Sequence, residues 1–262
     1  MQPILLSDRI SLIYFERGVL EQDGFALVLR QEDGKYAIPS GKTSILMLGP
    51  GVNVTHAAVR LCAIDGVLLL WVGEYGVRVY GVSTPHSTPE RLLKQSEKHL
   101  SRELRLDAAR RIFYLMFGEH PPIRFSIEQI RGLEGSRVKL WYEEQAKHHG
   151  MEWHGRSKSL TSPIDLALAG CNAALYGLTE AVILALGYSP SIGFVHAGDA
   201  RSFVFDLADT IKFSTVAPLA FQLAKEHGEQ LSEGIVRRAC RDLFYREKIA
   251  DQLINNAENI FA

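Results

Sequence analysis

Through residue 82 the hydrophobic positions fall in short runs separated by turn residues, a pattern that is typical of β-strands. Residues 55–66 differ, because their apolar positions have helical spacing, with Thr55 placed as an N-cap and Gly66 just past the end. The pattern therefore predicts a sheet or sandwich that carries one short helix. The predicted strands are 10–15, 18–24, 25–30, 31–41, 44–51, 67–72 and 76–82.

Helical spacing dominates after a cluster of Ser, Thr and Pro at 83–90, which has no periodicity and is typical of a linker. Residues 90–118 form one long amphipathic pattern that stops before the prolines of "EHPP". Beyond these prolines, Ser126 with Gln129 three residues later resembles a capping box, which predicts a helix that ends near Gly150.

A third helix start is marked by Ser162 followed by Pro163. The segment 164–187 is apolar nearly all round, so we expect it to be the buried central helix, with further helices after it. The predicted fold class is α+β. It consists of an N-terminal β-sandwich-like domain at 1–82, a linker at 83–90 and a C-terminal all-α helical, catalytic domain at 91–262.

The composition is that of an ordinary globular protein, with 262 residues, 47% hydrophobic and 23% charged. The longest apolar run, at 66–73, is too short to cross a bilayer, and the N-terminus does not resemble a signal peptide, so we expect no membrane or secretory segment. Cys62, Cys171 and Cys240 are far apart and odd in number, which predicts no disulfide framework and favours a cytoplasmic location. Because the net charge is −1, a polyanion would have to bind to a local basic patch.

Polar groups interrupt the apolar segment 191–213, where His196 precedes Asp206 and Asp209. On a helix the two aspartates share one face, and buried carboxylates persist only when they are paired, hydrogen-bonded or bound to a metal ion. Two interpretations are open. In the first, the aspartates pair with Lys212 or a neighbouring arginine, and His196 is an ordinary loop histidine. In the second, one imidazole and two carboxylates bind Mg²⁺ or Mn²⁺.

A second acidic group, Glu134, lies between Gly132 and Gly135 inside a helical pattern. Each glycine costs a helix about 1 kcal/mol relative to alanine, which indicates that something approaches closely there. Arg131 and Arg137 lie three residues on either side. They form either a surface ion pair with Glu134 or, if Glu134 binds a metal ion, a site for phosphate.

Three separated segments then resemble one known family, the CRISPR-associated integrase that inserts new spacers, in its type I-E subgroup. They are "THAAVRLCAIDGVLLLWVGEYGVRVYG", "RGLEGSRVK" and "GYSPSIGFVHAGDARSFVFDLADTIKF", and the likeness extends from about residue 6 to residue 244. The resemblance implies a metal-dependent enzyme of CRISPR adaptation, an integrase and endonuclease. In this reaction a DNA 3′-hydroxyl attacks a phosphodiester of the CRISPR array. It also implies a β domain, a helical domain, a homodimer and assembly with a small partner protein.

Carried over residue by residue, the resemblance places Mg²⁺ or Mn²⁺ on Glu134, His196 and Asp209, with Asp206 as a nearby acidic support in catalysis. This chain has "DLAD" where much of the family has a glutamate as the last ligand, and Lys212 where many relatives have arginine. The expected DNA substrates are a spacer precursor and the leader-repeat end of the array. The candidate DNA-binding residues are Arg60, Arg78, Arg131, Arg137, Lys139, Lys212, Arg237, Arg238 and Arg241.

Arg60 and Arg78 are the strongest candidates for contacts with the DNA backbone. Two other functions fit the same residues: a stand-alone metal-dependent DNase on branched or single-stranded DNA, and a non-catalytic DNA-binding scaffold. Because integration needs two strand-transfer events, we expect a homodimer. The apolar strands at 44–49 and 67–72 favour the β domain as its interface.

Overall fold

The structure is a computed structural model that describes residues 10–74, 79–83, 89–155 and 162–262. Its N-terminal part is one mixed sheet with strand order β3-β2-β1-β4-β5-β6. The strands are β1 (Ile10–Asp23), β2 (Ala26–Gln31), β3 (Gly34–Ile38), β4 (Thr43–Val54), β5 (Leu68–Val72) and β6 (Val79–Val82). β4 runs parallel to both β1 and β5, and the other neighbours are antiparallel.

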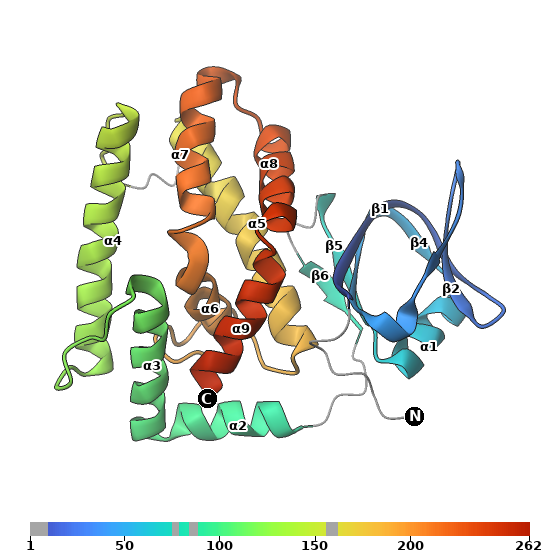
Figure 1. The fold of residues 1–262 in the computed structure, drawn as a ribbon, viewed down its shortest axis with the longest axis horizontal. Helices are drawn as coiled ribbons and strands as arrows, with labels where there is room; N and C mark the ends of the chain where they lie inside the picture. Colours follow the sequence, from blue (N-terminus) through green and yellow to red (C-terminus); the bar gives the residue numbers. More distant parts are fainter. Residues whose placement is uncertain (1–9, 75–78, 84–88, 156–161) are drawn as a thin grey trace.

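Of the two predicted forms, a sheet or a sandwich, the described strands form the first, a single hydrogen-bonded sheet that curls (Figure 1). Strand β4 lies in its middle and is buried on both faces. Leu46 and Leu48 pack towards α1 (His56–Asp65), whereas Ile45 and Met47 share a cluster with Ala181 of the helical part. Burial on both faces explains why this strand is a continuous apolar run.

The predicted caps are confirmed. The Thr55 side chain accepts the amide of Ala58 at the start of α1, and Gly66 ends that helix with a φ of 70°. Ser126 and Gln129 form the predicted capping box of α4 (Ile127–His149). Ser162 likewise caps α5 (Pro163–Ala185). These ends follow from local sequence alone.

The long helix predicted at 90–118 is wrong, because the chain turns at Ser101. This residue has extended dihedrals, φ −79° and ψ 119°, and its side chain accepts the amide of Leu104. It ends α2 (Glu90–Leu100) and caps α3 (Arg102–Phe117). Serine competes for backbone donors in this way, which favours a helix start over a helix interior.

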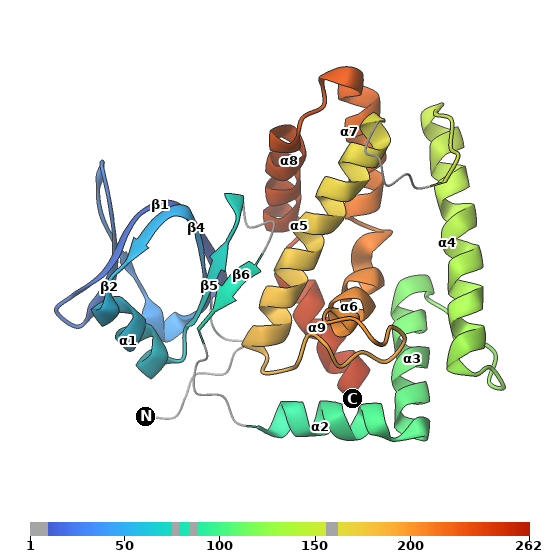
Figure 2. The same ribbon diagram turned by 180° about the vertical axis from the view of Figure 1, so that it is seen from behind.

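Figures 1 and 2 show α5 crossing the middle of the helical part, with α4 at one edge of the molecule and the sheet at the other. The remaining helices are α6 (Ser202–Lys212), α7 (Val216–His227), α8 (Glu233–Arg246) and α9 (Ile249–Phe261). Within the described residues α5 is also the one helix long and apolar enough to cross a membrane, but 67% of that stretch is buried in the protein, as in a core helix. The α+β prediction, strands first and helices after, is confirmed.

Candidate active site

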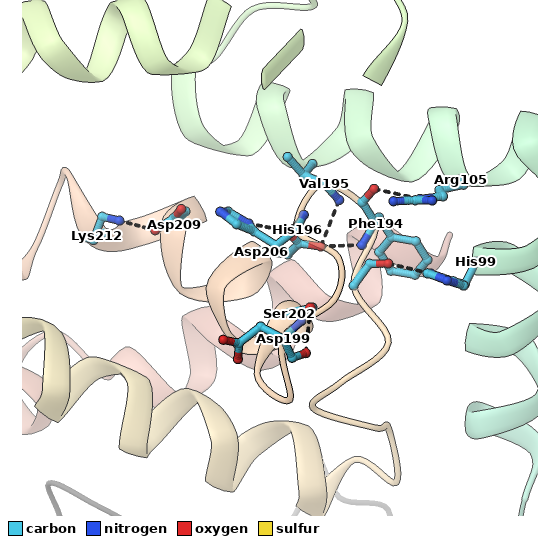
Figure 3. A network of polar contacts seen from close by, with 11 residues as sticks. His99, Arg105, Phe194, Val195, His196, Asp199, Ser202, Asp206, Asp209 and Lys212 are labelled. Carbon is cyan, nitrogen blue, oxygen red and sulfur yellow. Dashed lines mark hydrogen bonds and ion pairs between the residues drawn. The ribbon is translucent and has the colours of Figure 1, made fainter. Parts of the chain in front are cut away.

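Asp206 is the most buried acidic group of the site, 1% exposed on α6. Its Oδ2 accepts the backbone amides of Phe194 at 2.5 Å and Val195 at 3.1 Å. Its Oδ1 accepts both the amide and the imidazole Nδ1 of His196, at 2.9 and 2.8 Å (Figure 3). Four donors therefore satisfy this carboxylate, which accounts for its burial.

The same contacts fix the direction of the His196 ring. Nδ1 donates to Asp206, and in the described part of the chain nothing hydrogen-bonds to Nε2. The ring lies between Asp206 and Asp209 and packs edge-on against Phe205, with centroids 5.7 Å apart (Figure 3). The hydrogen bond to Asp206 raises the pKa of His196, and burial opposes this shift. The negative charges of Asp209 and Glu134 also raise the pKa.

Asp209, one turn further along α6, forms an ion pair with Lys212. Both side chains are buried, and Lys212 is 6% exposed. Burial lowers the pKa of Lys212, but the charge of Asp209, its hydrogen bond and the nearby Tyr176 and Tyr142 together outweigh that effect, so the net shift is upward and the ammonium stays charged. Of the first interpretation above, the pairing of Asp209 with Lys212 is thus present in the structure, whereas Asp206 is held by backbone amides and by His196.

Glu134 reaches the same region from α4, where its side chain is half-buried. Burial and the negative charge of Asp209 raise its pKa, whereas the charges of His196 and Lys212 lower it, and the net pKa is about 7. These mutual effects place the carboxyl of Glu134 in one electrostatic environment with His196 and Asp209. Topology thus brings together three side chains that are far apart in the sequence.

The donor chemistry of this trio fits a divalent cation. An imidazole whose Nδ1 is held by a carboxylate and whose Nε2 is free is the usual state of a metal-binding histidine. The charge of Asp209 raises the cost of ionising Glu134, and a cation between the two carboxylates would offset that cost. No group of three metal-binding side chains is already closed among the described residues, so the carboxylates must approach His196 more closely to hold an ion.

Gly132 and Gly135, beside Glu134, are not required by packing within the chain. A Cβ atom added to either would meet no atom within 4 Å in the described structure. Their exposed face continues through Arg131 and Ser136. This face of α4 is therefore open to a large ligand.

Three side chains of α2 and α3, which were not predicted from the sequence, hold the His196 loop from its other side. Gln95, 0% exposed, donates to the carbonyls of Ser189 and Ile192, His99 donates to that of Gly193, and Arg105 donates to that of Phe194. Figure 3 shows His99 and Arg105 opposite Asp206. The acceptors are backbone carbonyls, which leave no signature in a sequence. The one available signal was a buried glutamine in an amphipathic helix.

Several of the candidate DNA-binding residues have partners within the chain. Arg137 pairs with Glu119 and lies over the rings of Phe113 and Phe117, 5.2 and 5.1 Å from their centroids, which ties α4 to α3. Arg237 pairs with Glu74 at 2.7 Å and also with Glu233. The remaining pairs are Arg241 with Asp242 and Lys139 with Glu143.

Three other candidates, Arg60, Arg131 and Arg238, are exposed. Arg60 lies on α1, at the far end of the molecule from α4 (Figure 1). Arg78 lies outside the described residues. The structure therefore gathers Glu134, His196, Asp206, Asp209 and Lys212 in one place and leaves the arginines dispersed.

Comparison with known proteins gives a consistent result. The sequence matches the family described as CRISPR associated protein Cas1 over residues 12–116 and 123–239. It is 45% identical over 270 residues to the CRISPR-associated endonuclease Cas1 of Escherichia coli K12, and 42% identical over 269 residues to that of Geobacter sulfurreducens, each time covering 100% of this chain and 88% of the relative.

Solved structures agree. A crystal structure of a TtCas1–DNA complex superposes with a TM-score of 0.88 at 32% identity, covering 99% of this chain and 98% of that one. A casposase bound to its integration product shares the fold, with a TM-score of 0.59 at 17% identity over 91% of this chain and 86% of that one. The resemblance carried by the three sequence segments is confirmed: the chain belongs to the Cas1 family of CRISPR-associated endonucleases.

Proposed function

We propose that this protein is a metal-dependent DNA integrase that inserts spacer DNA into a CRISPR array in the cytoplasm. The observation that carries the proposal is the arrangement around His196: Asp206 fixes its Nδ1, while none of the described residues hydrogen-bonds to Nε2, in a region that also holds Glu134 and Asp209. Such a set can organise phosphate chemistry without a nucleophile of its own.

In the proposed reaction, the 3′-hydroxyl of the incoming DNA strand attacks a phosphorus atom of the array. A new phosphodiester forms, and the bond from that phosphorus to the 3′-oxygen of the neighbouring array nucleotide breaks. Mg²⁺ or Mn²⁺, held by Glu134, His196 and Asp209, would stabilise charge on the phosphate and on the attacking or leaving oxygen when bound. Asp206 maintains the tautomer and direction of the imidazole.

Lys212 balances the charge of Asp209 while no cation is bound, which makes the buried carboxylate tolerable. With a cation held at Asp209, the ammonium of Lys212 would be free to pair with phosphate, the role that we assign to it towards DNA. The open face of α4 at Gly132 and Gly135 is where the DNA backbone comes close to Glu134. Arg131 borders that face and is exposed, so we assign it a phosphate contact.

A relative solved in complex with DNA and relatives named endonucleases support DNA as the substrate. Arg60, exposed on α1, and Arg78 are proposed as contacts with the duplex away from the reacting phosphate. The two ends of one inserted spacer require two copies of the site. We therefore propose a homodimer through the sheet-containing part, together with the small partner protein of the adaptation complex.

The decisive experiment supplies a labelled DNA duplex with free 3′-hydroxyls and an array substrate, with and without Mg²⁺ and with and without the small partner protein. The proposal predicts joined products that require the metal ion. Nicked array DNA without joined product would indicate a DNase. DNA binding without any metal-dependent product would indicate a scaffold.

A further inference from the structure

Arg105, near the start of α3, makes an unusually direct connection to the site. Its Nε donates to the carbonyl oxygen of Phe194 at 2.9 Å. The amide of Val195 belongs to the same peptide group and donates to Asp206 at 3.1 Å. One planar peptide unit therefore joins a cation on α3 to the buried carboxylate on α6. His196 is the next residue, and Asp206 accepts both its amide and its Nδ1.

The electrostatics of this arrangement are favourable at both ends. The peptide dipole has its negative oxygen towards the guanidinium of Arg105 and its positive N–H towards Asp206. Hydrogen bonds to charged groups are about twice as strong as neutral ones, and arginine keeps its charge at every relevant pH. The preceding peptide is held in the same way, by His99 on its carbonyl and Asp206 on its amide, at 2.7 and 2.5 Å.

Arg105 also lies near the beginning of α4, the helix that carries Glu134. The pKa of Glu128, in the first turn of α4, is lowered by a hydrogen bond from Ser126, and the charge of Arg105 adds to that effect. The residue thus lies where the His196 loop, α3 and α4 meet.

We propose that Arg105 is a positioning residue for His196, holding the Phe194–Val195 peptide so that the imidazole Nε2 keeps its direction in the site. The inference rests on the proposed function, because it assigns Arg105 a task within that same site. Arg105 contacts neither substrate nor reacting atoms in this role, which separates it from the arginines proposed to bind phosphate.

Arg102 supplies the matched control. It lies one turn earlier on α3, it is exposed, and its charge also acts on Glu128, but it makes no hydrogen bond to the loop within the described structure. Arg105→Met and Arg102→Met each remove one positive charge from the same helix. Arg105→Lys keeps the charge and a donor on a side chain of different shape.

The experiment measures three quantities on the full-length chain. They are the Mn²⁺ concentration that gives half-maximal strand transfer, the Mn²⁺ affinity by titration calorimetry on the DNA-bound protein, and the slope of log DNA affinity against log salt. Loss of a side chain that orients a metal ligand typically costs about 10- to 100-fold in metal affinity or activity. Arg105→Met is expected to show that loss in the first two quantities, with partial rescue in Arg105→Lys, whereas Arg102→Met stays near wild type.

Two results would overturn the inference: equal behaviour of Arg105→Met and Arg102→Met, or a reduced salt slope in Arg105→Met alone, which would make Arg105 a phosphate contact. If Arg105→Met does not fold, Arg105→Lys decides between wild-type and weakened Mn²⁺ binding. Failure of the wild type to show metal-dependent strand transfer would refute the proposed function instead.

Discussion

The imidazole Nδ1 of His196 lies 2.8 Å from Oδ1 of Asp206, and the same carboxylate accepts three backbone amides of the His196 loop. With its donors complete, Asp206 has no need of a metal ion, although it lies beside the proposed ligands. The part that we propose for it in the reaction is to orient His196 and to hold the loop. Asp209, by contrast, pairs with Lys212 alone among the residues that the structure describes. Two aspartates three residues apart thus have different tasks.

Asp206→Asn tests the first of these tasks. The amide is nearly the same size, but it cannot accept at both oxygens and places an N–H against backbone N–H groups. We expect the free energy of unfolding to fall by about 2 to 4 kcal/mol, because a buried hydrogen-bonded charge is being replaced by a partly unsatisfied group. Urea denaturation measures this. A variant as stable as the wild type would contradict the four-donor geometry.

The ion pair of Asp209 with Lys212 leads to a second prediction. Asp209→Asn leaves a buried ammonium without its counter-charge, so we expect a loss of about 3 kcal/mol in unfolding free energy. The double variant Asp209→Leu/Lys212→Met removes both charges and should recover most of that stability, while strand transfer stays absent in both. If thermal or urea unfolding finds the double variant no more stable than the single one, the pair does not account for the burial of Lys212.

Much of this molecule could be predicted where the cause is local. Thr55, Ser126 and Ser162 predict the starts of their helices, because each N-cap side chain needs only a backbone amide within the next three residues. Ser101 carries the same signal, but it lies inside a continuous amphipathic pattern and was overlooked. The pairing of all six strands into one sheet depends on partners distant in sequence, which spacing cannot supply.

The site divides in the same way. Residue types and family resemblance pointed to Glu134, His196 and Asp209, and the fold brings them into one region. Spacing could not show that Asp206 orients His196 while Asp209 remains available to a metal ion. This difference depends on the backbone amides that donate to Asp206. The loop contacts of Gln95 and Arg105 were invisible for the same reason.

Glu134 gives a prediction about pH. Its pKa is raised to about 7 in the folded protein, above its ordinary value, so the folded state binds a proton more tightly than the unfolded state. Without metal, stability should therefore fall as pH rises from about 4.5 to about 7, and Glu134→Gln should remove that fall, worth about 1 to 3 kcal/mol. Wild type and variant should coincide near pH 4. Urea unfolding at each pH measures this. If the unfolding free energies of wild type and Glu134→Gln change in parallel across this range, the pKa of Glu134 is not raised.

The open face of α4 predicts that a larger side chain there raises stability but lowers activity. Gly135→Ala adds a methyl group that meets no atom within 4 Å and improves helix propensity, so the protein should gain up to about 1 kcal/mol. DNA affinity and strand transfer should nevertheless fall, and more so in Gly135→Leu, because the side chain occupies the space of the DNA backbone. Melting temperatures and DNA titrations on the same samples measure both effects. Undiminished DNA affinity in Gly135→Leu would mean that DNA does not approach this face.

The most direct test of the central claim is strand transfer by the wild type and by His196→Ala at equal concentration, with Mg²⁺, array DNA and a labelled duplex bearing free 3′-hydroxyls. The wild type should yield joined products only when the metal ion is present. His196→Ala should lose at least about 100-fold of that product while remaining folded, because the imidazole is a proposed metal ligand at a partly exposed site. Joined product at the wild-type level from His196→Ala, or from wild type without a divalent cation, would contradict the account.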